Sequence, residues 1–283
     1  MPEIFGFDCY SPKEIAERVE NVGVTKASLP LVSQGALGML AGGFIGLGAM
    51  FFTLVASDGG LSFAVARVLG GVVFSLGLIL VVIAGAELFT GNNLLVMATV
   101  AGRISPSKFA QNLVVIYCAN LIGAIVLAGL VALSEYWQMN DAAVGKTAVS
   151  IAAMKCTVPF GKAFFKGVLC NVLVCLAVWL AMAGRTVTDK ILAIVFPISA
   201  FVACGFEHSV ANMYFIPLGI FLKAQVISPG TVDLSVLNWT GLAHNLIPVT
   251  LGNLMGGAGM VGLVYWVIYR RHSVSNPPAV TSK

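Results

Sequence analysis

GAELFTGNN, residues 85–93, interrupts an otherwise aliphatic part of the chain. Glu87 is the sole charged residue between residues 68 and 102. This run is longer than the ~20 residues of one helical crossing of a bilayer, yet too short for two crossings and a turn. Helix-breaking residues at membrane depth are tolerated where protein or a cavity satisfies the freed backbone groups. We therefore predict that the run crosses the membrane once, as a broken helix.

A matching interruption lies in the second half of the chain. Residues 191–222 form another long apolar run, with charged or imidazole side chains only at Glu207 and His208. Both interruptions fit the pattern G-x-E-x-x-x-x-N, which begins at Gly85 and at Gly205. Asparagines with equal spacing follow in each half, Asn112 with Asn120 and Asn245 with Asn253. Two motif pairs in the same order indicate an internal repeat.

The apolar runs predict six crossings, at residues 27–57, 68–102, 109–133, 158–182, 191–222 and 244–269. Each half holds three of them, an odd number, so the second half must be inserted upside down relative to the first. The predicted fold class is an all-α membrane protein. It has six transmembrane helices in two inverted three-helix repeats, and the second and fifth helices are broken.

The composition supports a membrane-embedded chain and excludes other classes. Of the 283 residues, 58% are hydrophobic and 10% are charged, and the mean hydropathy is +0.95, whereas soluble domains carry about 25% charged residues. The crossings leave no room for a separate soluble catalytic domain. Scattered Lys and Arg residues exclude nucleic acid as a partner. The six cysteines lack paired metal-ligand spacing, so neither a metal nor a cofactor is expected.

Three regions are predicted along the chain. An N-terminal cytoplasmic segment contains an amphipathic helix at residues 11–27, begun by a Ser11-Pro12-Lys13-Glu14 cap. A transmembrane domain and a cytoplasmic tail follow. The N-terminal segment covers residues 1–30, the transmembrane domain 31–271 and the tail 272–283. Within the transmembrane domain, the two repeats cover about 31–134 and 157–271. Polar loops are predicted between the repeats and around Pro229-Gly230.

The charges predict how the chain lies in its membrane. More of the Lys and Arg residues fall on the side of the two termini, which favours cytoplasmic N- and C-termini by the positive-inside rule. A multi-pass protein of a bacterial-type inner membrane is expected. The N-terminus lacks a basic stretch followed by an apolar one, so no cleaved signal peptide is expected.

The two interruptions also limit the function. Half-helices that start at the membrane midplane point their free amides and positive dipole ends inward, which favours an anion. Such dipole ends also exclude protons and cations in water channels, but the paired NPA tripeptides of aquaporins are absent from this sequence. The predicted class is a channel or transporter for a small solute, and not an enzyme.

Individual residues receive roles from the same reasoning. His208 is a pore candidate because an ionisable side chain at membrane depth is a functional hypothesis by default, and a hydrogen-bonded core histidine is the alternative. Bare acids would repel an anion. We therefore predict a structural role at the helix breaks for Glu87, Glu207, Asn92 and Asn212. An intramembrane metalloenzyme around Glu207-His208 is disfavoured because no H-E-x-x-H pattern follows.

Four segments resemble the formate/nitrite transporter family: GAELFTG at 85–91, CNVLVCLA at 170–177, GFEHSVANM at 205–213 and NLIPVTLGN at 245–253. The resemblance covers nearly the whole chain. It implies an aquaporin-like bundle that assembles as a homopentamer with one pore in each protomer. It also implies a substrate pathway along His208, Thr90, Lys155, Asn171 and Asn253. The implied constrictions are Phe74 with Phe201 on the periplasmic side and Leu88 with Phe89 on the cytoplasmic side.

The expected function is pH-dependent permeation of a small monovalent anion, formate first, with protons and the lipid bilayer as further partners. Our hypothesis is that Lys155 and the half-helix dipoles draw the anion in. Asn171 and Thr90 then replace its water, and His208 offers a positive charge or a proton. Nitrite and hydrosulfide remain alternatives within the family, and a non-transporting scaffold or receptor is the alternative from another class.

Overall fold

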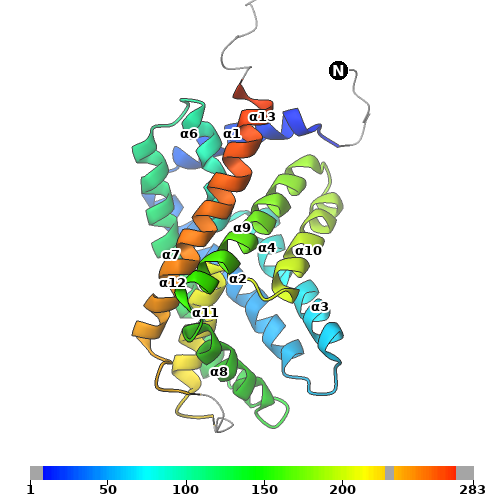
Figure 1. The fold of residues 1–283 in the computed structure, drawn as a ribbon, viewed down its shortest axis with the longest axis vertical. Helices are drawn as coiled ribbons and strands as arrows, with labels where there is room; N and C mark the ends of the chain where they lie inside the picture. Colours follow the sequence, from blue (N-terminus) through cyan, green and yellow to red (C-terminus); the bar gives the residue numbers. More distant parts are fainter. Residues whose placement is uncertain (1–8, 227–232, 272–283) are drawn as a thin grey trace, which may run out of the picture.

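The structure is a computed structural model that describes residues 9–226 and 233–271. These residues fold into a bundle of helices (Figure 1). Helix α1 (Pro12–Ala27) crosses one end of the bundle, near the last helix, α13 (Val264–Tyr269), and α8 (Ala143–Cys156) lies toward the other end. The predicted turn at Pro229-Gly230, residues 1–8 and the tail 272–283 lie outside the described residues.

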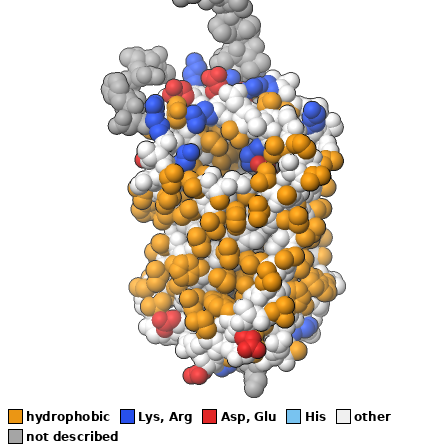
Figure 2. Space-filling view, turned by 180° about the vertical axis from the view of Figure 1, so that it is seen from behind, with side chains coloured by type: hydrophobic (Ala, Val, Ile, Leu, Met, Phe, Trp, Pro, Cys, Tyr) orange, Lys and Arg blue, Asp and Glu red, His pale blue; other side chains and the backbone are white. Residues whose placement is uncertain are grey.

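Among the described residues, five helical segments are long and apolar enough to span a membrane. They are α2 (Leu31–Ala56), Phe63–Gly85, α7 (Pro106–Leu133), α9 (Phe160–Ala183) and Trp239–Tyr269. Figure 2 shows hydrophobic side chains over the middle of one face, with charged side chains gathered toward its two ends. The part of the chain that the structure describes is all-helical, and its apolar segments are those of a membrane protein, as predicted.

Two of these segments change helix type along their length. Phe63–Gly85 consists of α3 (Phe63–Phe74), α4 (Leu76–Ile79) and the π-helix η1 (Leu80–Gly85). Trp239–Tyr269 consists of α12 (Trp239–Leu254), the π-helix η4 (Met255–Leu263) and α13. The π-helix η4 contains Gly256, Gly257, Gly259 and Gly262, so little side-chain bulk opposes its wider turn.

Both predicted interruptions are present. The first separates η1 from α5 (Phe89–Asn92), η2 (Asn93–Leu95) and α6 (Val96–Val100), and the second separates α10 (Val187–Ala203) from α11 (Ser209–Leu222). Gly85 and Gly205 stand at the two breaks with φ of +83° and +70°. This left-handed conformation is open to glycine and costly for other residues.

The predicted polar loop between the repeats is wrong in one part, because it contains η3 (Tyr136–Gln138) and α8. Helix α8 buries small apolar residues at helical spacing, Val144, Ala148 and Ala152, and this buried face stabilises it. The second crossing also starts earlier than predicted, at Phe63. Arg67 lies within it because its guanidinium bonds to backbone carbonyls of the α10 end.

Helix α1 begins as predicted. The Ser11 Oγ accepts from the Glu14 backbone N–H at 3.4 Å, and the Glu14 carboxylate accepts from the Ser11 N–H at 2.7 Å. These reciprocal bonds form a capping box. The apolar face of α1 packs on the bundle, where Ile15, Ala16 and Val19 join a buried cluster with Trp179.

Glycines bring two pairs of helices together backbone to backbone. Gly42 of α2 faces the Asn120 carbonyl of α7, and Gly123 of α7 faces the Met39 carbonyl of α2. In the second half, Gly252 of α12 faces the Phe164 carbonyl of α9. A Cβ at any of these glycines would collide with the facing oxygen, as expected where small residues mediate helix packing in membranes.

Candidate functional site

Asn120, on the long helix α7, holds the first break in place through hydrogen bonds to its backbone. The Asn120 Oδ1 accepts from the Phe89 N–H at 2.9 Å, and its Nδ2 donates to the carbonyls of Gly38 and Glu87 at 2.8 and 2.9 Å. Asn120 is fully buried. Its amide thus satisfies the backbone groups that the interruption leaves free.

Asn253 fastens the second break with the same bonds. Its Oδ1 accepts from the Ser209 N–H at 2.9 Å, and its Nδ2 donates to the carbonyls of Gly167 and Glu207 at 2.8 and 3.0 Å. The resemblance implied that Asn253 lines the substrate pathway. In the structure it is fully buried and all its amide groups bond to backbone.

The two glutamates of the repeated motif lie in matching networks. The Asn92 Nδ2 donates to Glu87 at 2.7 Å, and the Asn212 Nδ2 donates to Glu207 at 2.6 Å. The same amides reach Asn112 at 2.9 Å and Asn245 at 2.7 Å. These contacts are consistent with the structural role predicted for the glutamates and for their asparagine partners.

Each glutamate also pairs with a lysine from a short helix, and these two helices lie at opposite ends of the bundle. The Lys26 Nζ of α1 lies 3.0 Å from a Glu87 oxygen, and the Lys155 Nζ of α8 lies 3.0 and 3.1 Å from the two Glu207 oxygens. Helices α1 and α8 therefore contribute equivalent cations. Lys155 was expected to face the substrate, and the structure brings it to Glu207.

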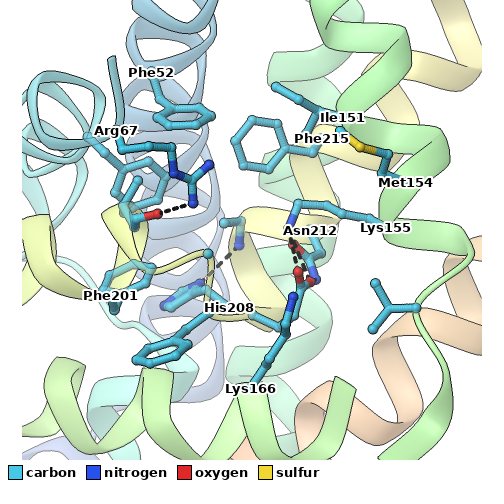
Figure 3. Close-up of a pocket in the computed structure, with 17 residues that line it drawn as sticks. Phe52, Arg67, Ile151, Met154, Lys155, Lys166, Phe201, His208, Asn212 and Phe215 are labelled. Carbon is cyan, nitrogen blue, oxygen red and sulfur yellow. Dashed lines mark hydrogen bonds and ion pairs between the residues drawn. The ribbon is translucent and has the colours of Figure 1, made fainter. Parts of the chain in front are cut away.

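The molecule holds a cavity on each side of the breaks. One, the distal cavity, has a volume of about 270 Å³, lies on the α8 side and is lined by residues that include Phe74, Lys155, Phe201, Glu207 and His208 (Figure 3). The other, the proximal cavity, has a volume of about 310 Å³, lies under α1 and is lined by residues that include Lys26, Val81, Glu87, Leu88 and Asn92.

His208 and Thr90 connect the two breaks between these cavities. The His208 Nε2 lies 3.1 Å from the Thr90 Oγ1, and the His208 Nδ1 accepts from the Ala211 N–H at 3.0 Å, which caps α11. Because Nδ1 acts as an acceptor, we assign the ring proton to Nε2, which donates to Thr90. Both side chains are buried, Thr90 completely.

Phe74 and Phe201 lie beside His208. Their ring centroids are 5.6 Å apart in an edge-to-face arrangement, and the Phe201 ring stacks on the imidazole at 5.8 Å. Both phenylalanines line the distal cavity. They form an apolar floor where the resemblance implied a constriction.

The two residues of the other implied constriction separate in the structure. Leu88 lines the proximal cavity and is almost completely buried. Phe89 lines neither of the two cavities, and its ring packs edge-to-face on Tyr117 at 4.9 Å. Of these two residues, Leu88 alone lines the proximal cavity.

Asn171 supports the Thr90 segment from α9. Its Nδ2 donates to the carbonyls of Thr90 at 3.3 Å and of Asn253 at 2.7 Å. The Cys175 thiol lies one turn further along α9 and donates to the same Thr90 carbonyl at 3.3 Å. In this conformation the Asn171 amide holds backbone, and it is fully buried.

The sequence reasoning missed three cations that line the cavities: Lys26, Arg67 and Lys166. Arg67 could have been found by its sequence signal, since it is the lone cation of the apolar segment Phe63–Gly85, whereas Lys166 shares its segment with Lys162. Lys26 carries no such signal, because it belongs to an amphipathic helix in which lysines are ordinary. Within the described residues, no group of three His, Cys, Asp or Glu side chains could hold a metal ion.

Interrupted helices that meet between two cavities, within an apolar bundle, define a membrane transport protein. A family model described as formate/nitrite transporter matches residues 13–267. The chain therefore belongs to the formate/nitrite transporter family, as the sequence segments indicated. This is a family of transport proteins and not of enzymes.

Relatives match over almost their full lengths. The chain is 39% identical to the formate channel FocA of Escherichia coli K12, over 94% of this chain and 97% of FocA. It is 39% identical to a probable formate transporter of Methanothermobacter thermautotrophicus, over 92% and 97%. A solved structure of a pentameric formate channel with formate bound shares 37% identity and a TM-score of 0.78, over 84% of this chain and 97% of that one.

Proposed function

We propose that this protein is a formate channel that assembles as a homopentamer with one pore in each protomer. The relatives named as formate channels and transporters support the substrate, and the similar pentameric formate channel supports the assembly. The observation that carries the proposal is the contact between His208 and Thr90 at 3.1 Å, between two cavities.

The proposed topology has six crossings in two inverted repeats, with both termini in the cytoplasm of a bacterial-type cell. The matched asparagine and glutamate networks of the two breaks support the repeat. The location of α1 and α13 at one end of the bundle supports an even number of crossings (Figure 1). On this topology the proximal cavity opens to the cytoplasm.

In the proposed pathway, the anion passes the apolar floor formed by Phe74 and Phe201 and then the polar pair His208 and Thr90. A bare anion in a dry, low-dielectric constriction would cost on the order of tens of kcal/mol. A hydrogen bond from the His208 Nε2–H, or a proton from a charged ring, would lower that cost. A neutral acid would cross the apolar residues far more easily than its anion.

The same geometry predicts a pH response. Charging the ring would place a proton on Nδ1, which faces the Ala211 N–H donor at 3.0 Å. Protonation therefore competes with the cap of α11. The charged groups that line the distal cavity together with His208 are Arg67, Lys155, Lys166 and Glu207.

The test is formate uptake into proteoliposomes at several pH values, with wild type and His208→Asn. An asparagine can still cap α11 but does not titrate, so the variant should transport formate with a flat pH profile. A variant that keeps the wild-type profile would refute the role of His208. Competition by nitrite and hydrosulfide in the same assay ranks the alternative substrates.

A further inference from the structure

The charges that line the distal cavity are unbalanced. Of the residues between 9 and 271 that the structure describes, three cations line it, Arg67, Lys155 and Lys166, with a single carboxylate, Glu207. The proximal cavity instead carries one cation and one carboxylate, which pair with each other at 3.0 Å. An excess of positive charge in a cleft with low-dielectric walls raises the local concentration of anions.

Lys155 does not supply this excess. Its ammonium lies 3.0 and 3.1 Å from the two oxygens of Glu207, and only 15% of its side chain is exposed. The pair is close to neutral when seen from the cavity. The unbalanced charge therefore resides on Arg67 and Lys166.

Arg67 has a defined place at the entrance. Its Nε donates to the Ala203 carbonyl at 2.8 Å and its Nη2 to the Val202 carbonyl at 2.9 Å, so the guanidinium covers the C-terminal end of α10. That end carries partial negative charge, which would repel an anion. Arg67 lines both the distal cavity and an adjoining hollow that holds Lys146. Figure 3 shows it across the cavity from Lys155.

Lys166 differs from the other two cations because, within the part of the chain that the structure describes, its ammonium has no bonded partner. It is half-buried on α9 and lines the same cavity. Its backbone carbonyl accepts from the Glu207 N–H at 3.3 Å, which fixes the base of the side chain beside the break. The ammonium is thus free to pair with a solute.

We propose that Arg67 and Lys166 form an anion-capture site in the distal cavity, and that Lys155 serves to hold Glu207. The site takes small monovalent anions with one or two acceptor oxygens. It is present on one side only, so it lowers the half-saturation concentration for transport that starts from the distal side. This inference rests on the proposed function, and it adds the residues of capture and their sidedness.

The experiment compares formate entry from the two sides of the membrane at low ionic strength. Proteoliposomes are sorted by affinity capture of a C-terminal tag, since the last described helix lies at the proximal end (Figure 1). Lys166→Gln should raise the half-saturation concentration from the distal side roughly fivefold, the effect of about 1 kcal/mol of Coulomb attraction, and leave the proximal value unchanged. Adding Arg67→Gln should raise the distal value further.

Two controls separate capture from folding. Lys162→Gln removes the same charge one turn earlier on α9, from an exposed residue that does not line the cavity, and should change neither value. Arg67→Lys keeps the charge and should keep most of the distal affinity. Because screening weakens such attractions, the difference between wild type and Lys166→Gln should shrink at about 1 M salt.

The outcomes distinguish the two proposals. If wild type carries formate but Lys166→Gln leaves the distal half-saturation unchanged, or Lys162→Gln shifts it equally, the capture site is refuted and the proposed function stands. A salt-independent effect of Lys166→Gln would also refute it. If wild type carries no formate from either side, the proposed function fails and this inference fails with it.

Discussion

The two ring nitrogens of His208 have different partners. Nδ1 is occupied by the Ala211 N–H, so the neutral ring presents its proton through Nε2 to the Thr90 hydroxyl. A hydroxyl that accepts one hydrogen bond still has its own proton to donate. The Thr90 hydroxyl can therefore accept a hydrogen bond from the ring and donate its own to an anion in the pathway. Its backbone carbonyl accepts hydrogen bonds from Asn171 and Cys175.

We expect Thr90→Val to lower formate flux roughly tenfold, which corresponds to about 1.4 kcal/mol in the barrier. The change keeps the volume of the side chain but removes the acceptor for Nε2–H and the donor for the anion. Flux in proteoliposomes is the measurement. Thr90→Ser retains the hydroxyl and should keep most of the flux, whereas wild-type flux in Thr90→Val would reduce the hydroxyl to a local structural group.

Much of this site could be predicted from the sequence at the residue scale. The glutamates were assigned a structural role because bare acids would repel an anion, and the repeated motif places them and the asparagines at equivalent positions of the two breaks. The roles of Lys155, Asn171 and Asn253 were less accessible. The backbone or carboxylate partners of each of these side chains lie far away in the sequence. No local pattern along the chain predicts which partners they contact.

At the scale of elements, the contact between α2 and α7 depends on backbone approach more than on side chains. Gly42 faces the Asn120 carbonyl, and this residue also fastens the first break through its side chain. The position of α7 against α2 therefore sets the position of the Phe89 N–H and of the segment that follows it. Packing at one glycine is coupled to the geometry of Thr90.

Neighbouring glycines in α2 provide a matched pair for a stability test. A Cβ at Gly42 would collide with the Asn120 carbonyl, whereas a Cβ at Gly43 meets nothing within 4 Å. Gly42→Ala should lower the stability by about 3 kcal/mol, as for overpacked cores. Gly43→Ala should be neutral or stabilising by up to about 1 kcal/mol through helix propensity.

The measurement is thermal unfolding of the purified protein in detergent, read by circular dichroism. Equal melting temperatures for Gly42→Ala and Gly43→Ala would contradict a close crossing of α2 and α7. Formate flux should fall in Gly42→Ala alone, because the displaced α7 moves Asn120 away from the Phe89 N–H.

The elements also show where sequence reasoning stops. Both broken helices were predicted, because length and the repeated glycine, glutamate and asparagine pattern define them locally. Helix α8 was not, since Lys146 and Lys155 lower its hydropathy and its buried face consists of small residues such as Ala148 and Ala152. The buried face of α8 is defined by its packing against α11 and neighbouring helices, which the hydropathy of α8 alone does not show.

For the whole molecule, α1 and α8 make equivalent lysine–glutamate contacts, and this corrects the place that the sequence suggested for the N-terminal helix. The sequence suggested an amphipathic helix outside the transmembrane domain. In the structure α1 supplies Lys26 to Glu87 as α8 supplies Lys155 to Glu207, and α1 lines the proximal cavity. A buried glutamate, Glu20, joins α1 to Arg270 through two bonds of 3.0 and 3.1 Å. Helix α1 is thus joined to the bundle by ion pairs and lines one of its cavities.

A double-mutant cycle tests this equivalence. Lys26→Met leaves the buried Glu87 carboxylate without its cation and should lower the stability by about 2 kcal/mol. Adding Glu87→Gln removes the unpaired charge, so Lys26→Met with Glu87→Gln should recover part of the loss. Thermal unfolding in detergent is the measurement, and strictly additive effects of the two changes would show that the pair contributes no coupling.

Leu88 and His208 occupy the same position of the two G-x-E-x-x-x-x-N motifs, three residues after the glycine. The chain carries a leucine at one break and a histidine at the other, while equivalent asparagines bond to the backbone at both. One break can therefore hold a side chain that titrates without any change in the contacts that hold the other.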